Sequence, residues 1–545
     1  MESMNTEMTD KQHMNNTEKD KNKLKSKNKT KKELAKDFAS NTSAHGFAYL
    51  VTSKYGAIHV LWVICIIASG TGMLYGIFSS FVIYLNFPTN EIVSKYTTKQ
   101  DFPAVTLCNV SPVSAYKAKL KNSVNSQSFI EYVQFLMKYD TLKSIPGFEE
   151  FKERFQSSES IMTNVNFENW SLQSHNWTDI ILSCKINSKA CPHNKDFFKP
   201  IMNPSFGICV TINGNQSAEK IKISTSGPTH GLSMLVFLDT YQEGLDNVIY
   251  DTESVIQGGS GLYVQVHPPG IQPDPVTKGV QIMPGQSTSI RIKTHVNKYL
   301  TYPHGNCTKP FFIDDIGYAH SETLCMGICK QALTREKCGC TSLGEPHDSR
   351  PYKSGLKMTG NLSYCGRFDI ENALSPHPNI TELDQLFATL RCQQNINLNF
   401  YSENDKTSCA CFPPCMDTTY EITTSASAWP EEMYMKGIYD HYINDRPDRD
   451  DLTVYNSMKH LNISSVVWKR HMKKNMLQLN IFFKDLEITL TEQVKSFTFT
   501  EMVSSIGGFF GFYMGISVLT LLEIGLFLAA IVKKTCCNQS NKDTI

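Results

Sequence analysis

The sequence predicts an α+β membrane protein in which two membrane-spanning helices bracket a large, disulfide-rich extracellular domain. Three observations support this class: two long apolar runs, a concentration of cysteines between them, and lysines on their outer flanks. A helix needs about 20 apolar residues to cross a bilayer, and both runs are longer than that. The chain is therefore divided into a cytoplasmic N-terminal region (1–56), a first span (57–85), an extracellular domain (86–503), a second span (504–532) and a cytoplasmic tail (533–545).

The second apolar run, SSIGGFFGFYMGISVLTLLEIGLFLAAIV, differs from a plain hydrophobic anchor. It contains five glycines and a single ionisable residue, Glu523. Small residues let helices approach closely, and a carboxylate inside a membrane is costly unless it faces protein or water. Several copies packed around a water-filled path would meet both needs, so we interpret this run as part of a pore. The alternative is a single-pass anchor with a helix-dimer seam.

Lysines predict the orientation of the two spans. Residues 1–40 are polar and rich in lysine, and Lys533 and Lys534 follow the second span. Cytoplasmic segments carry the excess of Lys and Arg, so we expect both termini in the cytoplasm and a multi-pass protein of the plasma membrane. The first apolar run starts too late and is too long for a signal peptide. The basic start would also fit nucleic-acid binding, but the net charge of +1 favours a cytoplasmic flank and no nucleic-acid partner.

The cysteines indicate an oxidising compartment. Of 17 cysteines, 14 lie between Cys108 and Cys415, an even number that predicts a disulfide framework. Two CxC pairs in this segment would also suggest zinc, but they lack the usual ligand spacing, and we expect no metal site and no cofactor. The same segment holds seven Asn-x-Ser/Thr motifs that predict glycosylation: Asn169, Asn176, Asn215, Asn306, Asn361, Asn379 and Asn462.

The extracellular segment shows no enzyme signature. It contains no P-loop, GxSxG, HExxH or dinucleotide-binding pattern, so we expect a protein that is not an enzyme. Residues 112–200 look helical, and residues 201–300 alternate apolar and polar side chains as strands do. Residues 430–476 look partly helical, and residues 477–500 look like a strand that leads into the second span.

Several motifs together resemble the degenerin and epithelial sodium channel superfamily, which also contains acid-sensing and peptide-gated channels. His45 and Gly46 precede the first span, as does the family's cytoplasmic HG motif. The sequence FPAVTLCN (102–109) resembles the family's first extracellular strand, and PSFGICVTIN, GPTHGL and PHGNC resemble further family blocks. The triplet at 515–517 resembles its GxS selectivity filter. These motifs cover nearly the whole chain in the family's order.

The resemblance implies a trimer of identical or homologous subunits with a hand-like extracellular domain. Its parts would be a palm, a β-ball, a finger (about 112–200), a knuckle and a thumb (about 308–415). The order of the cysteines then implies seven disulfides: Cys108–Cys209, Cys184–Cys191, Cys307–Cys415, Cys325–Cys411, Cys329–Cys409, Cys338–Cys392 and Cys340–Cys365.

The resemblance also implies roles for residues of the second span. A break in the helix at the filter would let backbone carbonyls of three chains replace part of the water shell of a permeant Na⁺. A ring of carboxylates nearer the cytoplasm would attract cations. A small residue at the outer mouth would form the gate, and the HG motif would be needed for gating. The expected residues are Gly515, Ile516 and Ser517 for the filter, Ser504, Ser505, Gly508 and Glu523 for the pore and gate, and His45 and Gly46 for the gating motif.

The segment AKDFASNTSAHGF (35–47) is similar to that of the invertebrate FMRFamide-gated sodium channels. This likeness implies a ligand-gated, sodium-selective, amiloride-sensitive channel opened by a short extracellular neuropeptide. The linker before Phe102 lacks the histidine of acid-sensing members, which disfavours protons as the stimulus. Alternatives are acid, bile-acid or constitutive gating within the same family, or a non-conducting cell-surface receptor or adhesion protein. Candidate peptide contacts are Glu131, Tyr132, Phe135, Tyr139, Phe197 and Phe198.

Overall fold

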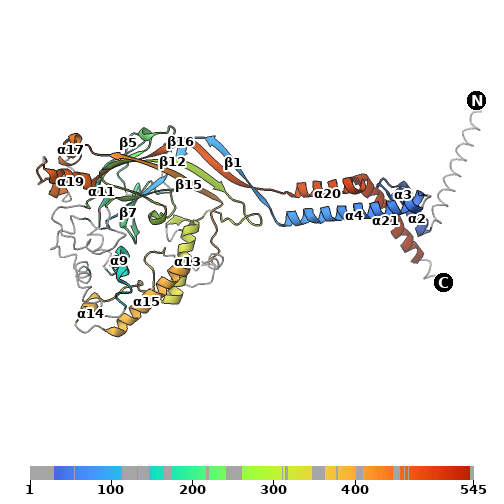
Figure 1. The fold of residues 1–545 in the computed structure, drawn as a ribbon, viewed down its shortest axis with the longest axis horizontal. Coiled ribbons are helices and arrows are strands. Elements are labelled where there is room, and N and C mark those ends of the chain that lie inside the picture. Colours follow the sequence, from blue (N-terminus) through green and yellow to red (C-terminus); the bar gives the residue numbers. More distant parts are fainter. Residues whose placement is uncertain are drawn as a thin grey trace, which may run out of the picture. The chain divides into compact units, whose positions relative to one another are not determined.

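The computed structural model forms two compact units, Met1–Asn90 with Val494–Ile545, and Glu91–Gln493. Each unit is described by itself, and Figure 1 shows their elements. The structure describes residues 30–53, 56–112, 114, 132, 147–155, 157–164, 174–194, 196–215, 220–240, 260–309, 311–313, 317–346, 362–375, 379–400, 409–445, 455–459, 461–463 and 465–539.

The first unit is built on two helices that lie side by side, α4 (Gly56–Leu85) and α20 (Phe499–Met514) (Figure 1). Gly72 and Gly76 permit this close approach. A Cβ at Gly72 would lie 2.7 Å from the Tyr513 ring, and a Cβ at Gly76 would lie 2.7 Å from the Phe509 ring. Glycines four residues apart share one helix face, which is the small-residue packing motif of membrane helices.

The second apolar run forms two helices instead of one, α20 and α21 (Val518–Gln539). Their axes differ in direction by 77°, and together they have the length and apolar composition needed to cross a membrane, as α4 has alone. Helix α20 begins at Phe499, before the expected residue 504, because Thr498 caps it. Thr498 Oγ1 accepts from Glu501 N at 3.3 Å, and the Glu501 carboxylate accepts from Thr498 N at 2.6 Å.

Two short helices, α2 (Lys31–Asn41) and α3 (Phe47–Thr52), precede α4 in the chain. Thr30 and Glu33 form a capping box at the start of α2. The chain turns between the two helices at Gly46, which has a φ of 88°. That left-handed conformation favours glycine, so the turn depends on this residue.

The second unit contains two larger sheets and two strand pairs. The seven-stranded sheet runs β15 (Met416–Ala428), β12 (Gln286–Lys298), β16 (Met476–Lys495), β9 (Leu232–Phe237), β4 (Ile181–Ile186) and β5 (Lys189–Ala190), with β1 (Thr89–Thr97) paired to β16. The five-stranded sheet runs β11 (Val280–Ile282), β10 (Leu262–His267), β3 (Ala104–Asn109), β7 (Gly207–Ile212) and β6 (Phe198–Asn203). The pairs are β2 (Gln100–Asp101) with β8 (Lys222–Ile223), and β13 (Phe312–Ile313) with β14 (Tyr318–Ala319).

One apolar core joins the two larger sheets. Val105 and Val264 of the five-stranded sheet belong to the same buried cluster as Leu232, Ile290 and Ile481 of the seven-stranded sheet. Every residue of β3 is buried, and its two polar side chains have hydrogen-bond partners: Thr106 Oγ1 lies 2.8 Å from Thr211 Oγ1, and Asn109 Nδ2 donates to the Leu238 carbonyl at 2.8 Å. The family resemblance implied that the FPAVTLCN block forms the first strand after the first span. This expectation is wrong, because β1 and β2 precede it. The nine residues of β1 are all exposed, so the strand has no alternating pattern to reveal it.

Residues 112–200 contain strands as well as helices, and the helical expectation is wrong for β4, for β5 and for the start of β6. Strands β4 and β9 pair antiparallel from Ile186 opposite Leu232, so tertiary pairing sets their conformation. The described helices of this region are α8 (Lys152–Phe155), α9 (Ser158–Asn164) and α11 (Trp177–Ile180). The amphipathic stretch at 128–139 lies outside the described residues except for Tyr132.

Seven disulfides connect the pairs that the family resemblance implied. Three of them start from one helix, α13 (Glu322–Cys338), which lies beside α15 (Ile380–Asn399). These bonds close loops of 86, 80 and 54 residues. Cross-links of this length stabilise a fold mainly by restricting the unfolded chain.

The remaining described α-helices are short. Helix α12 (Pro275–Lys278) lies beside the five-stranded sheet, and α14 (Ile370–Leu374) packs in one cluster with α15. Helices α17 (Glu432–Tyr439), α18 (Asn456–Lys459) and α19 (Val466–Asn475) pack against the seven-stranded sheet. Trp468 and Met472 of α19 bury their side chains in one cluster with Met435 of α17 and Phe237 of β9. This cluster covers the end of the sheet where β9 and β16 pair.

Gly231 gives a direct test of the sheet packing. A Cβ at this position would lie 2.2 Å from the carbonyl oxygen of Ile481, in the backbone of β16. We expect Gly231→Ala to destabilise the protein by about 1–3 kcal/mol and to lower its thermal unfolding midpoint. The matched control is Gly437→Ala in α17, where a Cβ meets no heavy atom within 4 Å and alanine is the better helix former. An unchanged midpoint for Gly231→Ala would refute this packing.

Candidate functional site

The break between α20 and α21 lies at the predicted filter. Helix α20 ends at Met514, and Gly515 takes a left-handed φ of 60°. Ser517 then caps α21: its Oγ accepts from Thr520 N at 3.3 Å, and Thr520 Oγ1 accepts from Ser517 N at 3.1 Å. The three residues Gly515, Ile516 and Ser517 thus form a short non-helical segment whose two ends are capped locally. Their role in ion selectivity remains a prediction.

The HG motif lies against this break. The backbone N–H of His45 donates to the backbone carbonyl oxygen of Met514 at 2.9 Å. This bond satisfies one of the last carbonyls of α20. The imidazole covers Gly515 so closely that a Cβ there would lie 1.6 Å from His45 Nδ1. Glycine is therefore required at position 515 for two reasons: the backbone has a left-handed φ, and the His45 ring leaves no room for a Cβ.

Glu523 forms hydrogen bonds with the segment that precedes His45. Its Oε2 accepts hydrogen bonds from Ser43 N at 3.0 Å, Ser43 Oγ at 3.2 Å and Thr42 Oγ1 at 3.2 Å. Ser43 Oγ also lies 2.6 Å from Thr520 Oγ1, a fully buried hydroxyl group. The carboxylate is thus held by donors from the N-terminal segment, and hydrogen bonds to a charged acceptor are stronger than neutral ones.

Sequence reasoning placed Glu523 in the pore but missed its partners. Thr42, Ser43 and Thr520 received no role, although two of them stand directly before Ala44 and His45. The hydroxyl residues beside the HG motif could have predicted this contact, since the lone carboxylate of an apolar span needs hydrogen-bond donors.

Two ring stacks hold the N-terminal helices in the same unit. Phe38 of α2 stacks on Phe527 of α21 with ring centroids 4.3 Å apart, and Tyr49 of α3 stacks on Trp62 of α4 at 4.4 Å. Such pairs contribute about 0.5–1.5 kcal/mol beyond their burial. The segment around the HG motif is therefore anchored on both sides of His45.

The remaining pore residues lie apart from this contact. Ser504 and Ser505 are in the first half of α20 and Gly508 is just past its middle, and Ser504 and Gly508 are exposed. At about 1.5 Å per residue, Ser504 is about 16 Å along the helix from Gly515. The structure therefore brings together the filter, the HG motif and Glu523, but not the expected gate. The role of these three residues in gating remains a prediction.

Five of the seven predicted glycosylation sites lie in described parts of the chain. Asn176, Asn215, Asn306, Asn379 and Asn462 are exposed, as an acceptor asparagine must be. Asn169 and Asn361 lie outside the described residues.

Two of the six candidate peptide contacts are buried in the structure. Tyr132 is fully buried, with its hydroxyl 2.6 Å from the Phe155 carbonyl oxygen and 2.7 Å from Ser160 Oγ. Phe197 is also buried and packs edge-on against Phe198. Tyr132 and Phe197 therefore belong to the core and not to a surface that a peptide reaches. Glu131, Phe135 and Tyr139 lie outside the described residues.

These features define a class of protein: a disulfide-rich domain inserted between an apolar helix and a broken apolar helix. The chain belongs to the amiloride-sensitive sodium channel family, whose sequence profile matches residues 38–527. That match includes the HG motif, the filter triplet and Glu523.

Three relatives span nearly the whole chain. The FMRFamide-activated amiloride-sensitive sodium channel of Cornu aspersum is 27% identical over 90% of this chain and 82% of its own length. Acid-sensing ion channel 1A of Danio rerio is 24% identical over 93% of this chain and 89% of its own. The bile acid-sensitive ion channel of Mus musculus is 23% identical over 90% of this chain and 87% of its own. All three are named as ion channels and none as an enzyme.

Gly515→Ala tests the contact between the HG motif and the break. The added methyl group would collide with the His45 ring and strain the left-handed turn, so we expect the segment before α3 to detach. Lys36 of α2 is exposed already, but the helix protects its peptide bond, so detachment should loosen α2 and speed tryptic cleavage there in the purified protein. Gly525→Ala in α21, where a Cβ meets nothing within 4 Å, is the matched control. Equal cleavage rates in both variants would contradict the contact.

Proposed function

We propose that this chain is a subunit of a sodium-selective, amiloride-sensitive plasma-membrane channel that a short extracellular neuropeptide of the FMRFamide type opens. The main observation in favour of ion conduction is the helix break at Gly515–Ser517, which His45 contacts. Irregular backbone at membrane depth is tolerated where it lines a cavity or is buried in protein. Carbonyls freed by the break are the groups that replace the water shell of a cation.

In this proposal both termini are cytoplasmic and three identical or homologous subunits surround the pore. The small residues on the far side of α20 from α4 support the assembly. A Cβ at Gly507, Gly508 or Gly511 would meet no heavy atom of the described chain within 4 Å. Glycines in this arrangement suit the close approach of a further helix. Glu523, close to the break, places a negative charge where a permeant cation passes.

Peptide gating is supported by the likeness to the FMRFamide-activated relative, and two buried histidines offer no response to mild acid. Identity is 27% to the FMRFamide-activated relative and 24% and 23% to the acid-sensing and bile acid-sensitive ones. Burial lowers the pKa of both His267 and His471 to about 4, so both stay neutral in mild acid. His267 is also fully bonded: Nδ1–H donates to the Pro268 carbonyl at 3.0 Å, and Nε2 accepts from the Thr106 hydroxyl at 2.8 Å. Neither histidine is therefore suited to sense mild acid.

Voltage clamp of oocytes that express only this chain tests the proposal. We expect FMRFamide at neutral pH to evoke an inward sodium current that amiloride blocks, and a step to acid pH without peptide to evoke none. An acid-evoked current with no response to a panel of related peptides would assign the chain to the acid-sensing group. A standing current without ligand would indicate constitutive gating, and surface protein without any current would indicate a receptor.

The same recording identifies the pore. In Ser517→Asp the reversal potential of the evoked current should shift because the filter would lose its preference for sodium. The matched control is Ser427→Asp on the exposed strand β15, which should leave the reversal potential unchanged. An unshifted potential in Ser517→Asp would place the conduction path elsewhere.

A further inference from the structure

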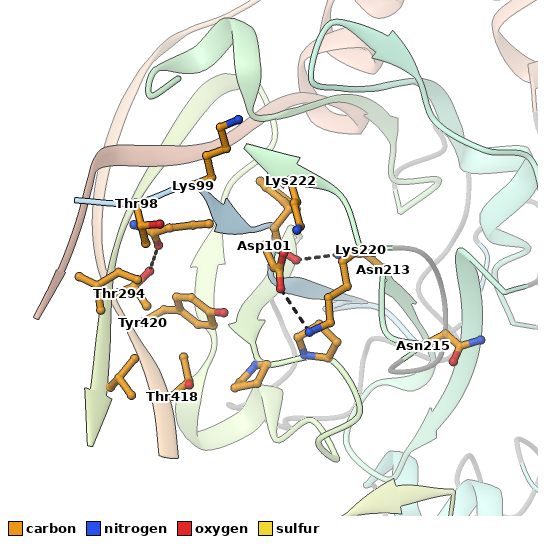
Figure 2. Close-up of a pocket in the computed structure, with 16 residues that line it drawn as sticks. Thr98, Lys99, Asp101, Asn213, Asn215, Lys220, Lys222, Thr294, Thr418 and Tyr420 are labelled. Atoms are coloured by element: carbon orange, nitrogen blue, oxygen red, sulfur yellow. Dashed lines mark hydrogen bonds and ion pairs between the residues drawn. The ribbon is translucent and has the colours of Figure 1, made fainter. Parts of the chain in front are cut away.

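The second unit contains a cavity of about 650 Å³ that no part of the proposed pore uses. We call it the basic cavity. Its walls come from the segment after β1, from the β2–β8 pair and from strands β12, β15 and β16 (Figure 2). Small-molecule sites are usually about 300–1,000 Å³, so this volume suits a compact organic ligand.

The charged side chains of the basic cavity are mostly cationic. Lys99, Lys220 and Lys222 line it, against the single carboxylate of Asp101. Lys222 lies opposite Asp101 in the β2–β8 ladder, and Lys220 Nζ is 3.2 Å from Asp101 Oδ2 (Figure 2). In the described part of the chain, Lys99 and Lys222 have no ion-pair partner. Two positive charges are thus left over at the cavity.

The Lys220–Asp101 pair does not cancel the attraction for an anion. Lys220 is 62% exposed and Asp101 is 42% exposed. Exposed ion pairs contribute little free energy, about 0–1 kcal/mol, so a ligand can compete for the lysine at small cost.

Gln100 adds an unsatisfied donor to the same wall. Its residue is only 5% exposed, and its Oε1 accepts from Thr294 Oγ1 at 2.5 Å. Its Nε2 is sealed from solvent and has no partner among the described residues. A buried donor without an acceptor costs about 1–3 kcal/mol. A ligand that offers an acceptor oxygen would recover this cost once the Gln100 amide group turns toward the cavity.

The walls also contain apolar groups, beside the neutral polar residues Asn213, Asn215 and Thr418. Pro268, Pro269, Val296 and Ile488 line the basic cavity, together with the ring of Tyr420. Burial raises the pKa of the Tyr420 hydroxyl, which therefore remains a neutral donor. The occupant must combine an acceptor-rich anionic head with an apolar body, and a cationic peptide would be repelled.

We propose that the basic cavity binds a small organic anion, a carboxylate or sulfonate on a compact apolar body. This site is separate from that of a cationic neuropeptide and does not depend on it. Its walls include Thr98, which follows β1, and Ile488 of β16, and Thr98 N donates to the Leu486 carbonyl at 3.3 Å. In the chain, β1 follows α4 and β16 precedes α20, so an occupant contacts β16 and the residue that directly follows β1.

Charge-selective labelling of an introduced cysteine tests the proposal without any current. Thr418 lines the basic cavity, and Ser427 lies exposed on the same strand away from it. Thr418→Cys and Ser427→Cys on intact cells are treated with methanethiosulfonates that carry a sulfonate or a trimethylammonium group. Relative to Ser427→Cys, we expect the sulfonate to be preferred about tenfold at Thr418→Cys. The chain without added cysteines gives the background.

The preference should depend on the lysines of the basic cavity. Lys220→Gln with Lys222→Gln should abolish it, whereas Lys185→Gln in β4 with Lys189→Gln in β5, two exposed lysines away from the cavity, should not. Unchanged labelling of Ser427→Cys in each background shows that the variants fold. Equal rates for the two reagents at Thr418→Cys, or a preference that survives loss of the lysines, would overturn the proposal.

Occupancy is tested with naphthalene-2-sulfonate as the probe. At millimolar concentration it should slow sulfonate labelling of Thr418→Cys at least threefold and leave Ser427→Cys unaffected. The neutral analogue 2-naphthol should protect less, and Gln100→Leu should weaken protection by the anion. Absence of protection, or equal protection by the neutral compound, would contradict an anion site.

Discussion

The contact between the HG motif and the helix break is the constraint on which the first unit depends. Breaking a helix frees backbone donors and acceptors, and apolar surroundings offer them no water. In this chain the groups freed by the break are bonded locally. Gly515 turns the end of α20, and Ser517 and Thr520 cap α21. The backbone N–H of His45 donates to the Met514 carbonyl. The break is thus a specified structure and not a loose point in a long helix.

The glycines of this unit serve different purposes, which the sequence alone does not separate. Gly72 and Gly76 give room to the rings of α20, and Gly46 and Gly515 adopt left-handed backbone. Gly507 and its neighbours on α20 meet no described side chain. A glycine-rich span indicates close packing in general, but the partner of each glycine emerges only from the fold.

Much of the architecture was predictable, and the failures have physical causes. Hydropathy predicted α4, and the motif resemblance predicted both the break at 515–517 and the disulfide pairs, which 14 cysteines leave undecided by spacing alone. Strand β1 was missed because all its side chains are exposed, and β4 because pairing with β9 outweighs its local pattern. The bonds from Thr42 and Ser43 to Glu523 join residues some 480 positions apart, which no local pattern reveals.

The second unit joins stability and recognition in one framework. Its two larger sheets share a core, and disulfides hold the helices that flank it. At one border of the sheets the polar residues form the basic cavity, with lysines and an orphaned amide donor. From the sequence alone, the lysines of this cavity would be interpreted as ordinary solvated surface residues. The pairing of β2 with β8 shows that they lie around one cavity.

Cross-linking tests the central contact most directly. Ser43 Oγ and Thr520 Oγ1 are 2.6 Å apart, so a chain with both residues replaced by cysteine should form an intramolecular disulfide when membranes are oxidised with copper phenanthroline. Peptide mapping without reduction should then recover residues 43 and 520 in one linked peptide. A chain with Ser43→Cys and Ser505→Cys should not link, because Ser505 lies on α20, about 14 Å along that helix from its end at Met514. Failure of the first pair to link, or equal linking by both, would contradict the account.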